Sequence, residues 1–209
     1  MNVPLLDLKA QYATIRSDIE SAVQQVLESQ QFINGPQVIE LEKQIADYCG
    51  ASYAVGVSSG TDALLCSLMT LGVGRGDEVI TTPFTFFATA GSIWRAGATP
   101  VFVDICPDTF NLDTDQIEDV ITEQTRAILP VHLFGQTADM DPVLTLAKKY
   151  ELDVIEDACQ AIGATYHRSR AGAMGTVGCF SFISSKNLGS LGDGGMIVAQ
   201  DEGLETRLQ

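Results

Sequence analysis

Basic side chains are scarce in this sequence. Twelve lysines and arginines stand against 27 aspartates and glutamates, so the formal net charge is −15. Proteins that bind nucleic acids or anionic membranes use clusters of basic residues. The composition therefore argues against both kinds of partner, and the acidity by itself indicates only a well-solvated surface.

Cysteine motifs and long apolar runs are also missing. The five cysteines lie far apart, at Cys49, Cys66, Cys106, Cys159 and Cys179. They form no CxxC or Cys/His ligand spacing, so neither a structural metal site nor a disulfide framework is expected. No apolar run approaches the length of a membrane span, and the N-terminal MNVPLLDLKAQY has no features of a secretory signal. We therefore expect a soluble, cytoplasmic protein with reduced thiols.

The first fifty residues have the apolar spacing of helices. Apolar side chains recur three or four positions apart from Leu8 to Leu27, which predicts an amphipathic helix. After the loop QQFINGP, Pro36 can begin a second helix that ends at Gly50. We expect residues 1–50 to form an N-terminal helical segment.

From residue 51 onward, short apolar runs alternate with helical segments. Seven runs are expected to be strands: 53–58, 78–82, 100–105, 127–132, 153–158, 179–184 and 196–200. Helices are expected to begin near Thr61, Ala88, Thr114 and Asp141. Continuous apolar strands between helices predict an α/β fold with a mainly parallel sheet and helices on both faces. The loop between the last two runs leaves no room for a crossover helix, so one of these strands is expected to be antiparallel.

The stretch GVSSG at 56–60 matches the G-x-S-x-G turn of α/β-hydrolases. On this interpretation Ser58 would be a nucleophile, with Asp157 and His167 as its later partners. Two features argue against it: only helices precede the strand that leads into the turn, and two further strands follow the histidine.

The same stretch can also bind an anion. A helix beginning near Thr61 would direct the free N–H groups of Gly60, Thr61 and Asp62 toward a phosphate, with the Thr61 hydroxyl beside them. An ordinary helix N-cap would use the same residues, so the stretch alone does not decide between the two.

Two charged residues lie near the ends of expected strands. Asp157 is at the carboxyl end of its strand, where open α/β sheets bind ligands, and it could accept a hydrogen bond from a protonated ring nitrogen or cap a short helix. Lys186 follows the strand that contains Ser181, in the segment FSFISSKNLGSLGDGG. A partly desolvated lysine can attack a carbonyl carbon, although most lysines in Gly/Ser loops are simply solvated.

Together these segments resemble the DegT/DnrJ/StrS family of nucleotide-sugar aminotransferases, which have fold type I and depend on pyridoxal 5′-phosphate (PLP). Seven motifs carry the resemblance from residue 4 to about residue 208: PLLDLKAQY, SSGTDAL, GDEVITTPFTF, PVFVDI, ILPVHLFGQTADMD, VIEDACQAIGATY and FSFISSKNLGSLGDGG. The resemblance implies that residues 51–209 are the PLP-binding large domain of this aspartate aminotransferase-like fold. It also implies a smaller C-terminal domain, which we expect to be absent from this chain.

The resemblance also assigns roles to individual residues. Lys186 would bind PLP covalently and serve as general acid and base, and Asp157 would keep the ring nitrogen protonated. Phe86 would stack on the ring, and Gln160 would bond its phenolic oxygen. The phosphate would be bound by Gly60, Thr61, Asp62 through its backbone N–H, and Ser181.

The implied activity is transfer of an amino group, usually from glutamate, to a nucleotide-linked keto-sugar in polysaccharide or secondary-metabolite biosynthesis. The resemblance further implies a homodimer with active sites at its interface. Two alternatives within the same fold are a non-catalytic or truncated PLP-binding domain and a sugar dehydratase. The dehydratase pattern replaces the lysine by histidine, so Lys186 argues against it.

Overall fold

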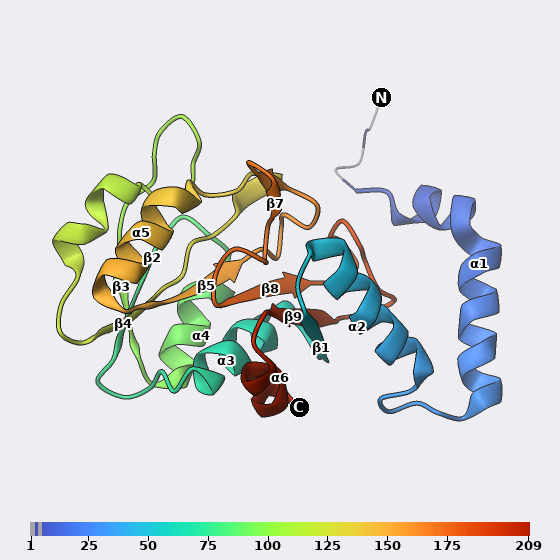
Figure 1. Cartoon of the computed structure of the whole chain (residues 1–209). Helices are drawn as coiled ribbons and strands as arrows, with labels where there is room; N and C mark the ends of the chain where they lie inside the picture. Colours follow the sequence, from blue (N-terminus) through green and yellow to red (C-terminus); the bar gives the residue numbers. More distant parts are fainter. Residues whose placement is uncertain (1–2, 4–5) are drawn as a thin grey trace.

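The computed structural model describes residue 3 and residues 6–209, and its centre is a single twisted sheet (Figure 1). The sheet contains seven strands: β1 (Tyr53–Val57), β2 (Glu78–Thr81), β3 (Thr99–Phe102), β4 (Thr125–Ile128), β5 (Asp153–Asp157), β8 (Val177–Ser181) and β9 (Gly195–Ala199). Their spatial order is β1-β9-β8-β5-β4-β2-β3. Only β9 runs antiparallel to its neighbours, β1 and β8. The predicted fold class is thereby confirmed, including the single reversed strand.

The strands are apolar because both faces of the sheet are covered. In β5, Val154 packs on one face with Val143 and Ala147, whereas Ile155 packs on the other with Leu64 and Leu68. Successive side chains of a strand point to opposite faces, so a strand buried on both sides needs an apolar residue at each of these positions.

Six α-helices accompany the sheet in the described residues: α1 (Leu8–Ser29), α2 (Pro36–Cys49), α3 (Gly60–Thr70), α4 (Ala88–Ala96), α5 (Met140–Tyr150) and α6 (Glu202–Leu208). Apolar residues of α3, α4 and α6 share one core cluster. Those of α2 and α5 belong to clusters on the opposite face. A separate hairpin of β6 (Thr165–Tyr166) and β7 (Ser169–Arg170) precedes β8. Because six of the seven strands of the sheet run in the same direction, their carboxyl ends and the loops that follow them lie at one edge of the sheet.

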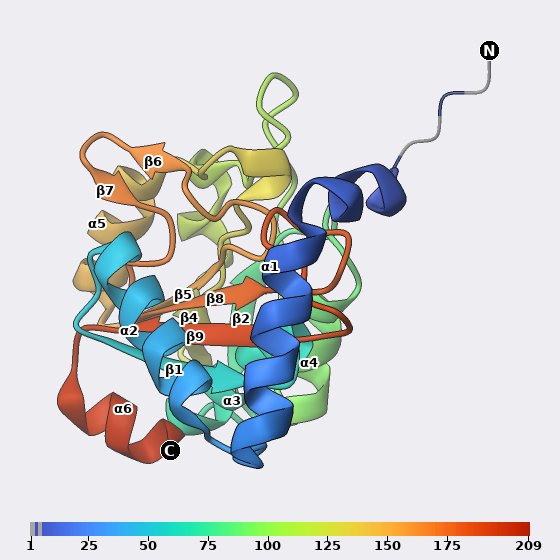
Figure 2. The same cartoon turned by 90° about the vertical axis from the view of Figure 1, so that its right-hand side faces the viewer.

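The predicted N-terminal helix is present, but its apolar stripe is not buried. Helix α1 lies at the edge of the molecule, with α2 between it and the sheet (Figures 1 and 2). Within α1 no residue is buried, and Tyr12 and Leu27 are 37% and 50% exposed. Amphipathic spacing thus predicted the helix correctly. Its apolar stripe only borders an open groove, which the first half of α1 forms with the loop between β8 and β9.

The structure corrects the prediction of a helix that begins near Thr114. This segment forms two short 3₁₀ turns, η1 (Thr114–Gln116) and η2 (Glu118–Val120). The Asp113 carboxylate accepts hydrogen bonds from the Asp115 N–H and from the Gln116 side chain, at 3.2 and 2.5 Å. Local bonds of this kind compete with α-helix formation, and β-branched residues next to them do not favour a longer helix.

None of the helices in the described part of the chain combines the length and the apolar character required to span a membrane.

Candidate active site

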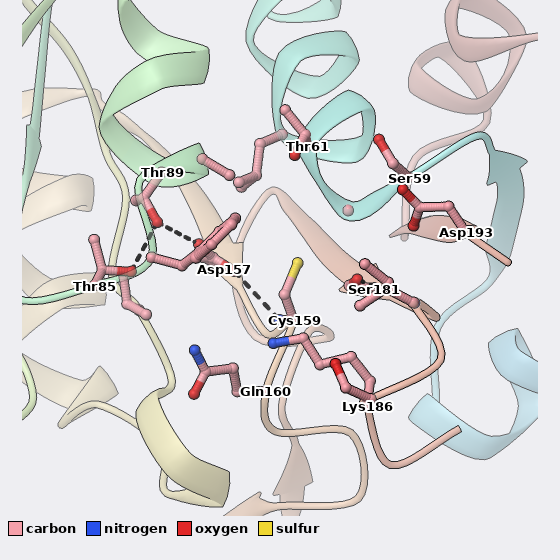
Figure 3. Close-up of a pocket in the computed structure, with 17 residues that line it drawn as sticks. Ser59, Thr61, Thr85, Thr89, Asp157, Cys159, Gln160, Ser181, Lys186 and Asp193 are labelled. Carbon is pink, nitrogen blue, oxygen red and sulfur yellow. Dashed lines mark hydrogen bonds between the residues drawn. The ribbon is translucent and has the colours of Figure 1, made fainter. Parts of the chain in front are cut away.

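A cavity of about 290 Å³ lies at the carboxyl edge of the sheet, between the ends of β5 and β8 and the first turns of α3 and α4 (Figure 3). Seven of the eight predicted site residues line it: Gly60, Thr61, Phe86, Asp157, Gln160, Ser181 and Lys186. These residues come from four separate segments of the sequence. The fold therefore brings together all of the predicted set except Asp62.

One end of the cavity is suited to an anion. Helix α3 begins at Gly60, and its first N–H groups have no intrahelical acceptors because no helical turn precedes them. A Cβ at Gly60 would lie 2.6 Å from the Ser181 Cβ and 2.9 Å from the Cys159 Sγ. Only glycine lets the start of the helix approach the end of β8 this closely, and the approach places the Ser181 hydroxyl beside the helix N-terminus.

Asp62 lies outside the cavity lining. Its N–H donates to the hydroxyl of Ser59, the N-cap residue of α3, at 3.0 Å. Its carboxylate accepts a hydrogen bond from Ser58 and lies 4.0 Å from Arg95. The N–H predicted to bind phosphate is thus used by the helix cap, and this geometry does not favour the predicted role.

The hydrolase alternative has no assembled triad. The Ser58 hydroxyl donates to Asp62, not to a histidine. His167 lies on the β6–β7 hairpin, with its Nε2 3.3 Å from Asp141. Asp157, the third residue of that hypothesis, bonds a threonine and a backbone N–H instead. A serine without a base cannot be activated in this way.

Asp157 is held firmly at the opposite end of the cavity. The residue is 5% exposed. Its Oδ2 accepts a hydrogen bond from the Thr89 hydroxyl at 2.7 Å, and its Oδ1 accepts one from the Cys159 N–H at 3.2 Å. Each oxygen keeps a lone pair for a further donor. The arrangement is that of an oriented carboxylate able to receive a hydrogen bond from a ligand.

Gln160 is oriented by the backbone. Its Oε1 accepts the N–H of Phe134 at 3.3 Å, which leaves the Nε2 group as the free donor. Phe134 has a φ of 53°, a left-handed conformation unusual for a bulky residue, in the 3₁₀ turn η3 (Leu133–Gly135). Phe86, 69% exposed, adds an aromatic side chain to the cavity wall.

Lys186 lies on the loop that connects β8 to β9. The loop turns back on itself, since the Lys186 N–H donates to the Ile183 carbonyl at 2.8 Å and the Ser190 N–H to the Phe182 carbonyl at 2.8 Å. Among the residues lining the cavity, Lys186 is the only basic one, and Asp157 and Asp193 are the acidic ones. The side chain of Lys186 therefore supplies the one cationic group of the cavity wall.

The Cys159 thiol forms part of the cavity wall. Burial, reinforced by the negative charge of Asp157, raises the pKa of Cys159 well above its usual value of 9.0. The thiol therefore stays neutral at physiological pH, and it is the thiolate that reacts. Cys159 is therefore not favoured as a nucleophile of this cavity.

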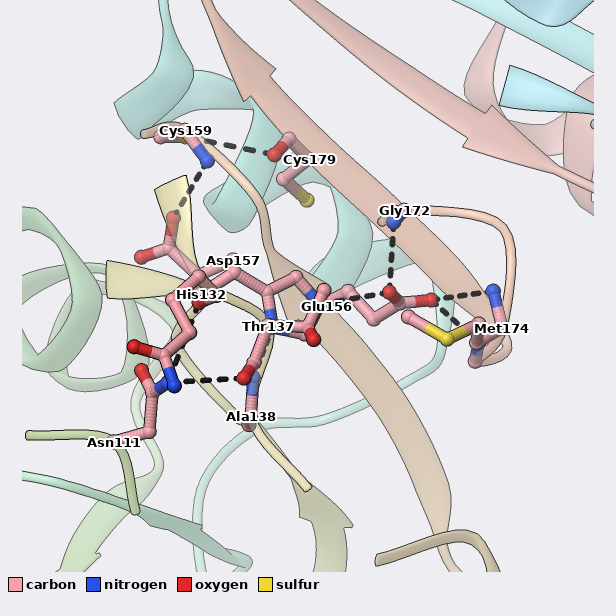
Figure 4. Close-up of polar contacts among 12 residues, drawn as sticks. Asn111, His132, Thr137, Ala138, Glu156, Asp157, Cys159, Gly172, Met174 and Cys179 are labelled. Atoms are coloured by element: carbon pink, nitrogen blue, oxygen red, sulfur yellow. Dashed lines mark hydrogen bonds and ion pairs between the residues drawn. The ribbon is translucent and has the colours of Figure 1, made fainter. Parts of the chain in front are cut away.

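Behind Asp157 lies a second polar cluster that is closed to solvent (Figure 4). Glu156, fully buried, accepts hydrogen bonds from the N–H groups of Gly172, Met174 and Gly175 at 2.6–2.7 Å. It also lies 2.8 Å from the Nε2 of His132. The cluster joins β5 to the segment that leads into β8, so it fixes the two strands that present Asp157 and Ser181.

Sequence reasoning missed several residues of the cavity wall, Thr85 and Thr89 above all. Thr85 lies in the loop after β2, and Thr89 lies in the first turn of α4. Their position between an expected strand and an expected helix was the available signal. Without the position of α4 relative to β5, it did not indicate Asp157 as their neighbour.

A model of the DegT/DnrJ/EryC1/StrS aminotransferase family matches residues 13–209. The chain is 53% identical over 204 residues to a "pleiotropic regulatory protein" of Geobacillus stearothermophilus, with 98% of this chain and 55% of that protein covered. It is 48% identical over 207 residues to UDP-2-acetamido-2-deoxy-3-oxo-D-glucuronate aminotransferase of Pseudomonas aeruginosa, covering 99% and 58%. The crystal structure of S. venezuelae DesV in complex with a ketimine intermediate superimposes with a TM-score of 0.96 at 46% identity, covering 99% and 56%. The chain thus spans little more than half the length of these relatives.

Proposed function

Because this chain belongs to the DegT/DnrJ/EryC1/StrS aminotransferase family, we propose that it is the cofactor-binding part of a PLP-dependent nucleotide-sugar aminotransferase. The reaction would convert a nucleotide-linked keto-sugar to an amino-sugar. The observation that carries the proposal is that Lys186, Asp157 and the start of α3 line one cavity. The name of the Pseudomonas relative, an aminotransferase of a UDP-linked oxo-sugar, supports the substrate class.

The residues around the cavity fit PLP. The first N–H groups of α3 and the Ser181 hydroxyl suit a phosphate, and Asp157 at the other end suits a protonated ring nitrogen. The Phe86 ring suits an aromatic face, and the free Nε2 of Gln160 suits a phenolic oxygen. The absence of a Cβ at Gly60 lets the helix start lie against Ser181, so both can face the same phosphate.

PLP supplies an electron sink that stabilises negative charge at the carbon losing a proton. The Nζ of Lys186 would hold the cofactor covalently between turnovers. Once released, the same amine would remove the proton from the α-carbon of the amino donor. Asp157 would keep the ring nitrogen protonated, which maintains the electron sink, and Gln160 would orient the ring by donating to its oxygen.

We also propose that glutamate is the amino donor and that the enzyme is a homodimer in which each subunit completes the site of the other. The charge distribution supports the second point. Lys186 is the one basic residue of the cavity lining, whereas a nucleotide diphosphate requires several cationic partners. On this proposal, residues 1–50 are a helical segment and residues 51–209 the PLP-binding large domain.

Borohydride trapping of PLP on the full-length protein tests the assignment. We expect one mole of PLP to be fixed per chain, on the peptide that contains Lys186, and glutamate to shift the absorbance of the bound cofactor and yield 2-oxoglutarate. Lys186→Ala should abolish the trapping, and Lys148→Ala, which alters an exposed lysine of α5, should leave it unchanged. Undiminished trapping in Lys186→Ala would refute the role of this lysine. Lys186 in place of histidine also predicts amino transfer in preference to dehydration.

A further inference from the structure

Two threonines lie in line with Asp157 (Figure 3). The Oγ1 atoms of Thr85 and Thr89 are 2.8 Å apart, and the Thr89 Oγ1 is 2.7 Å from the Asp157 Oδ2. Thr89 is fully buried, and Thr85 lines the cavity. A chain of hydrogen bonds thus runs from the cavity wall to the carboxylate, and its second bond, from Thr89 to Asp157, is buried.

The direction of this chain follows from the number of protons. An ionised carboxylate can only accept hydrogen bonds, so the Thr89 hydroxyl must donate to Asp157. A hydroxyl carries one proton, so the Thr89 oxygen can only accept from Thr85. Each hydroxyl therefore has its donor committed, and the Thr85 bond polarises the Thr89 bond in the sense that strengthens it.

Asp157 receives the threonine hydrogen bond on one carboxylate oxygen and a backbone hydrogen bond on the other. Thr89 belongs to the first turn of α4, whose positive dipole end favours a nearby carboxylate. The Cys159 N–H binds the other oxygen, Oδ1, at 3.2 Å. With one donor on each oxygen, rotation of the carboxylate about its Cβ–Cγ bond would break a hydrogen bond in a buried setting.

We propose that Thr89, and Thr85 through it, are positioning residues that fix the Asp157 carboxylate toward the ring nitrogen of bound PLP. This inference rests on the proposed function. Thr85 forms no hydrogen bond with Asp157, so we expect its effect on the carboxylate to pass through Thr89. The two threonines should then behave as one unit and not as two independent contributors.

A double-mutant cycle tests this on the full-length protein. Thr89→Val removes the hydroxyl at nearly constant volume, and we expect PLP to dissociate with a Kd roughly ten-fold higher, as for loss of one hydrogen bond to a charged group. Thr85→Val should raise the Kd about three-fold, since it only weakens the next bond in the chain. Thr89→Ser keeps the hydroxyl and should remain within about two-fold of the wild type. The double Val variant should match Thr89→Val alone.

A spectroscopic readout separates positioning from packing. In Thr89→Val, the pH at which the absorbance of bound PLP changes should shift, because the ring nitrogen loses a well-placed partner. Thr81→Val is the matched control: Thr81 is equally buried and its hydroxyl donates to the Leu129 carbonyl at 2.8 Å, outside the cavity. That variant should lower stability without altering either the Kd or the pH profile.

The possible results separate this inference from the proposed function. Additive increases in Kd in the double variant, or a Thr89→Val protein that binds PLP like the wild type, would overturn the positioning role of the threonines. Either result would leave the proposed function intact. A wild-type protein that fails to bind PLP would overturn both. If Thr89→Val does not fold, as judged by circular dichroism without PLP, then Thr85→Val carries the test, and an unchanged Kd and pH profile there would overturn the inference.

Discussion

The Nε2–H of His132 donates to the carboxylate of Glu156 across 2.8 Å, with both side chains completely shielded from solvent. The direction follows from the other ring nitrogen, because Nδ1 accepts the N–H of Ala138 at 3.1 Å. His132 therefore carries its proton on Nε2. The pair links the loop after β4 to β5, immediately before Asp157, and so supports the site from behind.

Glu156→Gln should destabilise the protein by about 3 kcal/mol, because the amide cannot accept as many hydrogen bonds as the carboxylate and would direct a donor at a donor. Urea denaturation monitored by circular dichroism measures the change in the free energy of unfolding. Glu123→Gln, an exposed glutamate, is the control and should stay within about 0.5 kcal/mol of the wild type. Equal stability of the two variants would show that the buried cluster does not support the fold.

Gly60→Ala should weaken PLP binding and destabilise the fold by about 1–3 kcal/mol, since its Cβ would lie 2.6 Å from the Ser181 Cβ and force α3 away from β8. Gly192→Ala offers a control on the neighbouring loop, because no atom lies within 4 Å of the Cβ it would add. Equilibrium dialysis with PLP and urea denaturation should separate the two variants. A Gly60→Ala protein that binds PLP as the wild type does would contradict the close approach of helix and strand.

Buried thiols should make the stability fall at alkaline pH. Burial raises the pKa of Cys49 from 9.0 to about 11, and raises those of Cys159 and Cys179 as well. Between pH 9 and pH 11 the unfolded Cys49 releases its proton while the folded one retains it, so the folded state binds more protons and loses stability as the pH rises. Each such thiol contributes a slope of roughly 1.4 kcal/mol per pH unit. Cys49→Ala should decrease the measured slope by about that amount, and identical slopes would disprove the explanation.

At Phe134, where the backbone is left-handed, the stability of a variant should depend on the backbone conformation that the new residue tolerates and not on its hydrophobicity. Its side chain is 75% exposed, so little burial is lost on replacement. Phe134→Gly should be within about 1 kcal/mol of the wild type, because glycine adopts a φ of 53° freely. Phe134→Val should cost about 1–2 kcal/mol, because β-branching is poorly tolerated there. Thermal unfolding would reveal the order, and a more stable valine variant would rule out backbone strain as the cause.

Most of the architecture was predictable because strands buried on both faces of a sheet appear in the sequence as short, continuous apolar runs. All seven strands were found, with ends displaced by no more than a few residues, and the reversal at β9 followed from the length of one loop. The segment at Thr114 failed for a local reason: Asp113 forms side-chain hydrogen bonds that replace a continuous helix. Such competition depends on distances that spacing alone does not provide.

The site shows a similar division. The presence of Lys186 and Asp157 at the cavity could be predicted because each charge lies near the end of an apolar strand, whereas threonines are common throughout the chain. Thr89 acquired a role only when α4 was placed against β5. The role predicted for the Asp62 N–H depended on the cap, and the Ser59 hydroxyl proved to be that N–H group's partner. Charge can thus be interpreted from sequence, but the choice of partner among polar neighbours requires the packed structure.

The pairing of β1 with β9 has a consequence for synthesis on the ribosome. The first strand to be made has the last as its neighbour in the sheet, with Tyr53 opposite Ala199. Helix α3, which follows β1 and whose first turn lines the cavity, is likewise made long before Ser181 and Lys186. The nascent chain therefore cannot assemble the cavity until nearly all of these residues have left the exit tunnel, and PLP becomes a ligand only of the finished sheet. Cofactor added during translation should stabilise the completed fold by mass action and leave earlier intermediates unaffected.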